Sequence, residues 1–99
     1  MKLAWYAWWQ SHGVQSIAEK HSLKPAHANW LEAFPFTTVG ELPAGEKIPS
    51  HVAGILGAME TRQVYGDGVF GGAYQSDPAV MDEIFSTAVA DVLQLLKFE

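Results

Sequence analysis

The first apolar segment of the chain is continuous rather than alternating. Residues 2–9 read Lys-Leu-Ala-Trp-Tyr-Ala-Trp-Trp, with apolar and aromatic side chains in both sets of alternating positions. A strand that is covered on both faces has this pattern, which is typical of parallel sheets in α/β folds. The pattern therefore predicts a buried strand over residues 2–9, and no second clear strand follows it in the sequence.

Two short helices are predicted next. Ser11 is suited to cap the first, because serine side chains accept hydrogen bonds from the free N–H groups at a helix start. This helix ends before Pro25, since the residue ahead of a proline avoids helical angles. The second helix covers residues 26–34 and ends before Pro35. The positions at helical spacing in the first helix are Val14, Ile17, Ala18 and His21.

The middle of the chain is rich in glycine and proline. Residues 35–50 contain three Pro and two Gly, which predicts a loop with one short strand at residues 36–39. Ser50 is suited to cap a helix over residues 51–64, although two internal glycines weaken it. Residues 66–76 predict a flexible glycine-rich loop that needs positive φ angles.

The last helix has the clearest signals. Asp77 is a favoured N-cap, and Pro78 suits the first helical position. One strand and a few helices do not complete an α/β domain, because such helices need a sheet to cover. We therefore expect the strand at residues 2–9 to pair with strands from elsewhere. The apolar stripe of the last helix contains Val80, Met81, Ile84, Phe85, Ala88, Val92, Leu95 and Leu96.

Composition supports an assembly. Only 17% of the 99 residues are charged, against roughly 25% in typical soluble chains, while 48% are apolar and four are Trp. A chain of this size buries only about two-thirds of its unfolded surface, so part of its exterior should be apolar. Large exposed apolar patches mark partner surfaces. We therefore expect an obligate assembly.

Charge and cysteine content exclude several classes. The net charge of −5 comes from residues 51–99, and no basic stripe is present, which argues against nucleic-acid binding. The absence of Cys excludes disulfides, Cys-ligated zinc and a Cys nucleophile, and it is compatible with the cytoplasm. The longest apolar run, residues 3–9, is far too short to span a membrane.

Most of the candidate chemistry has an ordinary explanation. Residues 66–71 match the G-x-G-x-x-G pattern formally, but a predicted helix precedes them and the next helix begins only at Pro78, so a loop is favoured. His12, His21 and His51 lack the spacing of a metal site and are expected at the surface or in packing.

His27 has more suggestive neighbours, because an aromatic ring and a carboxylate follow within about one and a half helical turns. On an ideal helix His27 and Glu32 lie about 140° apart, so they would not touch directly unless the first turn is irregular. Taken alone, these residues favour a helix start with a solvated His and Glu.

A family resemblance changes that weighting. Residues 27–33, His-Ala-Asn-Trp-Leu-Glu-Ala, resemble the HAG-x-x-ET segment of the creatininase family of metal-dependent amidohydrolases, with Asn29 in place of Gly and Ala33 in place of Thr. The aromatic strand before it and the Asp-Pro helix after it fit the family's order. The resemblance spans nearly all of this chain but only the C-terminal part of a family member. The continuation W-L-E-A-F-P-F-T is closer to the ring-opening hydrolases of oxidised inositols than to creatininase itself.

The resemblance implies the C-terminal half of a three-layer α/β/α fold. The family's metal-binding segments, E-x-H-G … D and N-G-H-G-x-N, do not occur in these residues. The chain begins with Met just before the strand, as a separately encoded half would. We therefore expect a second polypeptide to complete the sheet and to hold the divalent metal, Zn or Mn, with none held by this chain. A cytoplasmic hetero-oligomer of higher order is expected.

For the site, the resemblance implies ring opening at a C–N or C–C bond of a small cyclic substrate. His27 would transfer a proton to the leaving ring atom, since imidazole titrates near neutral pH. Glu32 would orient or polarise it, through water given the angular offset. Flat walls against the ring would come from Trp5, Trp8, Trp9 and Trp30, although at least two of these are expected in core or subunit packing.

Two alternatives from other classes stay open. The chain could be a non-catalytic subunit that completes a partner's fold while its site residues drift, and the changes at residues 29 and 33 favour this. It could also be a stand-alone homo-oligomer whose Trp-rich surface binds a small ring without turnover.

Overall fold

The computed structural model describes residues 1, 3–49 and 54–97. Its elements are three α-helices, two short 3₁₀ helices and a two-stranded sheet. In chain order they are η1 (Trp8–Gln10), α1 (His12–Lys20), η2 (Trp30–Glu32), β1 (Glu46–Lys47), α2 (Ala58–Tyr65), β2 (Gly72–Ala73) and α3 (Pro78–Leu95).

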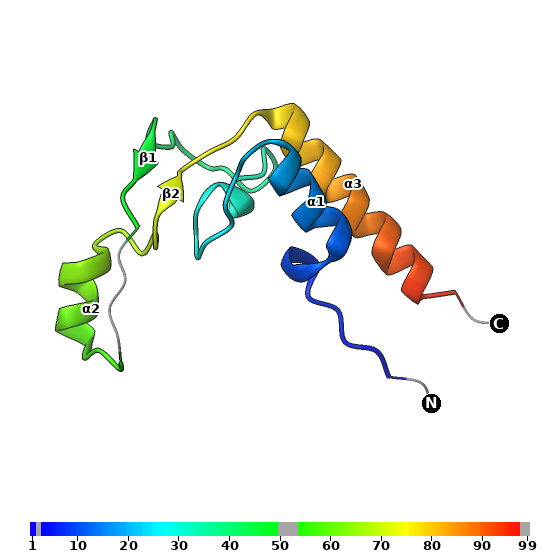
Figure 1. The fold of residues 1–99 in the computed structure, drawn as a ribbon, viewed down its shortest axis with the longest axis horizontal. Coiled ribbons are helices and arrows are strands. Elements are labelled where there is room, and N and C mark those ends of the chain that lie inside the picture. Colours follow the sequence, from blue (N-terminus) through cyan, green and yellow to red (C-terminus); the bar gives the residue numbers. More distant parts are fainter. Residues whose placement is uncertain (2, 50–53, 98–99) are drawn as a thin grey trace.

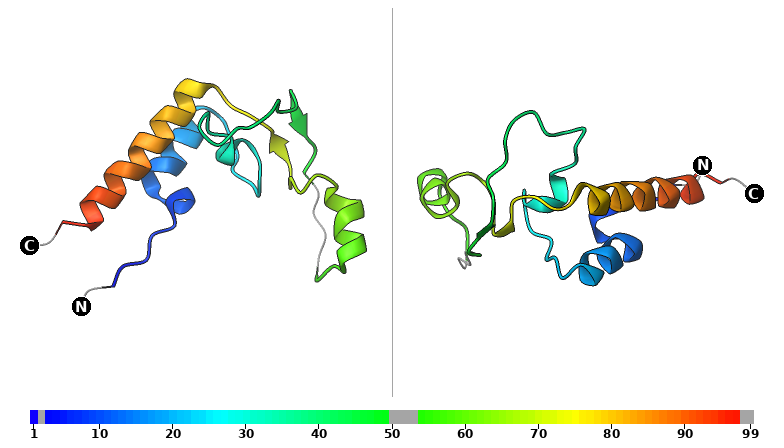
Figure 2. Two further views of the ribbon diagram at one scale, coloured as in Figure 1. Left: turned by 180° about the vertical axis from the view of Figure 1, so that it is seen from behind. Right: turned by 90° about the horizontal axis from the view of Figure 1, so that it is seen from above.

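The elements form an open arrangement. Helices α1 and α3 lie side by side, and α2 lies at the opposite end of the molecule, beyond the small sheet (Figure 1). Both views of Figure 2 show the same separation. The molecule measures 51 × 32 × 26 Å. None of the side chains of α2, all of which the structure describes, is buried, so the core belongs to the other end.

Helices α1 and α3 begin where the sequence predicts. The Ser11 side chain accepts a hydrogen bond of 3.2 Å from the Val14 N–H. The Asp77 side chain accepts one of 2.9 Å from the Ala79 N–H, and Pro78 takes the first position of α3. The predicted N-caps Ser11 and Asp77 are confirmed. Each contributes about 1 kcal/mol to the stability of its helix.

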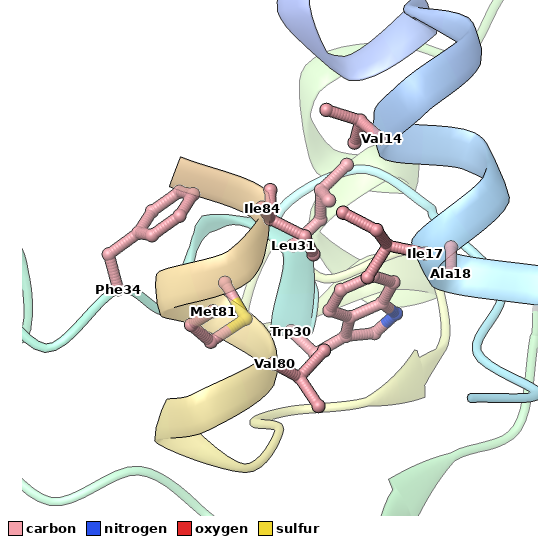
Figure 3. Close-up of a cluster of buried hydrophobic side chains, with 9 residues drawn as sticks. All are labelled: Val14, Ile17, Ala18, Trp30, Leu31, Phe34, Val80, Met81 and Ile84. Atoms are coloured by element: carbon pink, nitrogen blue, oxygen red, sulfur yellow. The ribbon is translucent and has the colours of Figure 1, made fainter. Parts of the chain in front are cut away.

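The core lies where α1, η2 and the first half of α3 meet (Figure 3). On α1 the apolar positions predicted at helical spacing are buried. On α3 only the first three positions of the predicted stripe are buried, and the later ones stay partly or largely exposed. The core side chains are Val14, Ile17, Ala18, Trp30, Leu31, Phe34, Val80, Met81 and Ile84.

The predicted strand over residues 2–9 is wrong for the part that the structure describes. Residues 3–7 have no regular structure, and the 3₁₀ helix η1 begins at Trp8. A strand requires a hydrogen-bonding neighbour, and within the described residues the only paired strands are β1 and β2. Ala7 nevertheless keeps extended angles, φ −108° and ψ 99°. A sheet completed by another chain stays a prediction.

The predicted helix over residues 26–34 shrinks to the single turn of η2. The reason lies at Ala28, whose φ of 57° is in the left-handed region and cannot belong to a right-handed helix. The predicted strand at residues 36–39 is also wrong, because Phe34 to Thr37 forms a turn closed by backbone hydrogen bonds.

The third predicted helix is shorter than expected. Of its predicted range, residues 51–53 and the cap Ser50 lie outside the described residues, and α2 begins only at Ala58. Gly54 has a φ of 89°, which cannot belong to a right-handed helix, so a continuous helix over the predicted range is not possible. The glycine-rich loop is confirmed, since Gly66, Gly68, Gly71 and Gly72 all have positive φ. It also contains β2, which pairs antiparallel with β1.

The two core helices approach each other at a glycine, and this yields a prediction. A Cβ atom on Gly13 of α1 would lie 2.7 Å from Cγ2 of Thr87 on α3. Gly13→Ala alone should therefore gain little, because the clash offsets a helix-propensity gain of about 0.5–1 kcal/mol. In a Thr87→Ser background the same change should raise the free energy of unfolding by that full amount. Urea unfolding of all four variants measures the coupling, and equal effects in both backgrounds would contradict the close approach.

Candidate functional site

A buried asparagine organises the turn that carries His27. The Asn29 side chain is only 1% exposed. Its Nδ2 donates to the carbonyl of Lys24 at 2.9 Å and to the carbonyl of Gly71 at 3.3 Å. Its Oδ1 accepts from the Leu31 N–H at 3.2 Å and so caps η2. One side chain thus joins the turn, the short helix and the glycine-rich loop.

The glycine-rich loop packs directly against His27. The Phe70 N–H donates to the His27 carbonyl at 3.1 Å. The two rings lie 4.7 Å apart between centroids, and Phe70 stacks in turn on Tyr65 at 4.2 Å with planes 21° apart. The imidazole is exposed at the end of this aromatic row. Its position is therefore set by a loop more than forty residues further along the chain.

His27 lies between two hollows. The first, which we call the histidine hollow, has a volume of about 520 Å³. The second, the aromatic cleft, has a volume of about 850 Å³ and includes Lys47, Tyr65 and Phe70 in its walls. The walls of the histidine hollow are Trp8, Trp9, Pro25, Ala26, His27, Leu31 and Glu32. The structure therefore brings both predicted catalytic side chains and two of the four predicted tryptophans to one cavity.

The four tryptophans divide between site and core. Trp8 is half-buried and meets Trp9 edge to face at 6.0 Å. Trp30 is 1% exposed, and its indole N–H donates to the Lys24 carbonyl at 3.0 Å, so it borders the aromatic cleft but packs mainly in the core. Trp5 is 92% exposed on the segment before η1. Only Trp8 and Trp9 stand in the wall of the histidine hollow.

The other histidines lie where the sequence predicts or outside the described residues. His12 is exposed at the start of α1. His21 lies just after α1, with Nε2 3.8 Å from the Glu83 carboxylate, which also faces Lys20 at 3.6 Å. His51 is not among the described residues.

An ion pair holds the loop that carries Phe70. Lys47 on β1 donates from Nζ to the Asp67 carboxylate and to the Tyr65 carbonyl. Asp67 also accepts from the Val69 N–H and from the Tyr74 hydroxyl, each at 3.0 Å. The hydrogen bond from Lys47, with those from the Val69 N–H and the Tyr74 hydroxyl, lowers the pKa of Asp67 to about 2. The hydrogen bond to that carboxylate in turn raises the pKa of Tyr74.

This ion pair predicts a pH dependence for the loop. The folded pKa of Asp67 is below its ordinary value of 3.8, so the pairing stabilises the loop above about pH 3.8 and is lost as pH falls toward 2. A carboxyl carbon NMR titration should give Asp67 a midpoint near 2. Lys47→Met should return it toward 3.8, and Lys20→Met should not. A wild-type midpoint at the ordinary value would contradict the pairing.

Sequence reasoning missed the parts of the site that depend on distant contacts. Asn29 entered only as a departure from a family motif, although an asparagine just before a short apolar helix is a favoured N-cap. Phe70 and Tyr65 carry no local signal. Phe70 contacts His27 because hydrogen bonds from Phe70 to His27 and from Asn29 to Gly71 join the glycine-rich loop to the turn, and Tyr65 stacks on Phe70.

The described residues contain no group of three or more His, Asp or Glu side chains arranged to hold a metal ion. No helix in the described ranges combines the length and hydropathy needed to cross a membrane. No family model, curated protein or solved structure matches the chain.

Proposed function

We propose that this chain is the small subunit of a heteromeric, creatininase-like hydrolase that opens the ring of a small cyclic amide. One observation carries the proposal: His27 and Glu32 line a single hollow whose walls also include Trp8 and Trp9. This juxtaposition supports the roles that the resemblance of residues 27–33 implies. A cytoplasmic location suits the cysteine-free composition.

His27 supplies proton transfer in this proposal. When water adds to a ring carbonyl carbon and the C–N bond breaks, the leaving nitrogen must take up a proton. His27 is exposed at the hollow and delivers that proton. Glu32 lines the same hollow and orients or polarises the imidazole. Trp8 and Trp9 offer flat apolar faces, and a volume of about 520 Å³ suits a small ring.

The residues that the structure describes do not fit the metal that the resemblance implies. Around His27, the hollow adds only Glu32 as a further ligand type, and a stable site needs three or more protein ligands. We assign the metal, Zn or Mn, to the second polypeptide. The contribution of this chain is confined to proton transfer and packing against the substrate.

The second polypeptide also completes the fold. Residues 3–7 contain apolar and aromatic side chains but lack a regular structure, and Trp5 and Leu3 are exposed. An extended segment of this kind gains hydrogen bonds when it joins the edge of another chain's sheet. With the partner's strands in the middle, α1 and α3 would cover one face of a three-layer α/β/α domain.

Reconstitution tests the proposal. The chain should co-purify with a polypeptide that carries E-x-H-G and N-G-H-G-x-N segments. Metal analysis should find metal in the complex and none on the isolated chain, and the complex should hydrolyse members of a panel of small cyclic amides. A monodisperse, well-folded monomer that binds no such polypeptide in light scattering would contradict the proposal.

A non-catalytic subunit is the second candidate. It is favoured by the burial of Asn29 and Trp30, since these two residues of the motif serve packing. In that case the complex would assemble in the same way, but substitutions at His27 would leave the partner's hydrolysis unchanged.

A further inference from the structure

The C-terminal half of α3 forms one side of an uncovered apolar groove. Its other side is formed by the N-terminal segment and the turn after η2, and its volume is about 560 Å³. Figure 1 shows this half of α3 extending beyond α1, which covers only the first half. The exposed apolar residues of the groove are Phe36, Phe85, Val89, Val92 and Leu93.

The distribution of these side chains on α3 indicates that the groove is covered in the working protein. Leu93 is 60% exposed and Phe36 67%. Leu95 and Leu96 at the end of the helix are exposed as well. At 100° per residue they share one broad apolar face with the groove residues of α3, opposite Thr87 and Gln94. An apolar face of this width normally packs against another element.

The exposed surface of the chain is larger than that of a compact monomer of the same mass. The chain exposes 7694 Å². A compact monomer of 10.8 kDa exposes roughly 5,500 Å² by the area–mass relation. Its radius of gyration is 15.9 Å, against about 13 Å for a compact chain of this length. The excess of roughly 2,000 Å² belongs to the whole open arrangement, with α2 and the groove each contributing part of it. It is as large as one side of a permanent interface, which buries about 2,000–5,000 Å² in total.

The charge of the groove favours a different polypeptide over a second copy of this chain. Glu32 is the only charged residue among the described side chains that line the groove. A second copy would bring the same carboxylate and another net charge of −5. A different polypeptide with a basic side chain would pair with Glu32 instead.

We infer that the groove binds an apolar segment of a different polypeptide, with a Lys or Arg of that segment placed at Glu32. The inference rests on the proposed function in one respect, that this second polypeptide is the one carrying the metal. Trp8 and Glu32 line both the groove and the histidine hollow. The bound segment therefore closes one side of that hollow, so assembly also shapes the substrate site.

Photo-crosslinking of the full chain in its own cells tests the inference. Phe36 or Leu93 is replaced by photoreactive benzoylphenylalanine, and Met59, which is exposed on α2, is replaced as the matched control. Both groove positions should crosslink to one segment of one other polypeptide, and that segment should be apolar and contain Lys or Arg. The control should give at least tenfold less of this product. Crosslinks to a second copy, or equal yields from Met59, would overturn the inference.

Affinity for the crosslinked polypeptide, once purified, gives a second measurement. Val89→Glu places an unpaired charge in the groove and should weaken binding at least about tenfold. Glu32→Lys should weaken it similarly, whereas Glu41→Lys, an exposed acid outside the groove, should not. Unchanged affinity for Val89→Glu would overturn the inference. A complex that forms through the groove but hydrolyses nothing would contradict the proposed function alone.

Discussion

Replacing His27 by Gln is expected to lower turnover by the assembled complex by about 10²–10⁴-fold, the usual contribution of a positioned general acid. His27 is exposed, and its ring meets that of Phe70 at an angle of 46°, so the variant should still fold and bind its partner. Steady-state kinetics on the purified complex, with light scattering to verify assembly, measures both properties.

The control for this variant is His12→Gln. His12 is also exposed, but it lies at the start of α1 and does not line the histidine hollow. Its replacement should leave turnover unchanged. With a substrate whose leaving nitrogen is weakly basic, bond breaking depends less on proton transfer. Turnover of such a substrate should therefore fall much less in the His27 variant. Turnover within tenfold of wild type on strongly basic leaving groups would contradict the role of His27.

Replacing Asn29 by Ala is expected to lower the free energy of unfolding by about 2–4 kcal/mol. The change removes the cap of η2 and two hydrogen bonds to carbonyl groups, each contributing about 0.5–1.5 kcal/mol. The Gly71 carbonyl, in a buried residue, loses its Asn29 donor. Urea unfolding followed by tryptophan fluorescence measures the loss, since Trp30 is adjacent in the core.

Asn29→Asp separates the two roles of this side chain. Asp caps helices as well as Asn does, so a residue that served only as a cap would tolerate the change. At this position, however, an anion would face the carbonyl oxygens of Lys24 and Gly71. We expect the Asp variant to be at least as unstable as the Ala variant. Wild-type stability of Asn29→Asp would show that the bridge to Gly71 contributes little.

Local signals in the sequence predicted the starts of α1 and α3 and most of the core. Ser11 and Asp77 act within three residues of their own positions, so their effect is visible in the sequence alone. The apolar face of α1 is likewise set by spacing. Each of these features depends on residues within one or two turns of the same helix.

The sequence could not predict the turn at residues 26–29, because its partners are distant. Asn29 bonds to Gly71, 42 residues away, and the neighbouring Ala28 has a left-handed φ of 57°. The helical angle expected between His27 and Glu32 therefore does not apply. Their presence at one hollow was predicted from the family resemblance rather than from helix geometry.

The separation of α2 from the core has a consequence for how the chain opens. An eight-residue helix with no buried side chain is marginal in water, and its amide protons are held only by local bonds. Helix α2 should therefore open at low free energy, while α1, η2 and the first half of α3 open only with global unfolding. Tyr65, at the end of α2, stacks on Phe70 and through it meets His27. A ligand held in the aromatic cleft would slow amide exchange in α2, which makes that helix a natural reporter of occupancy.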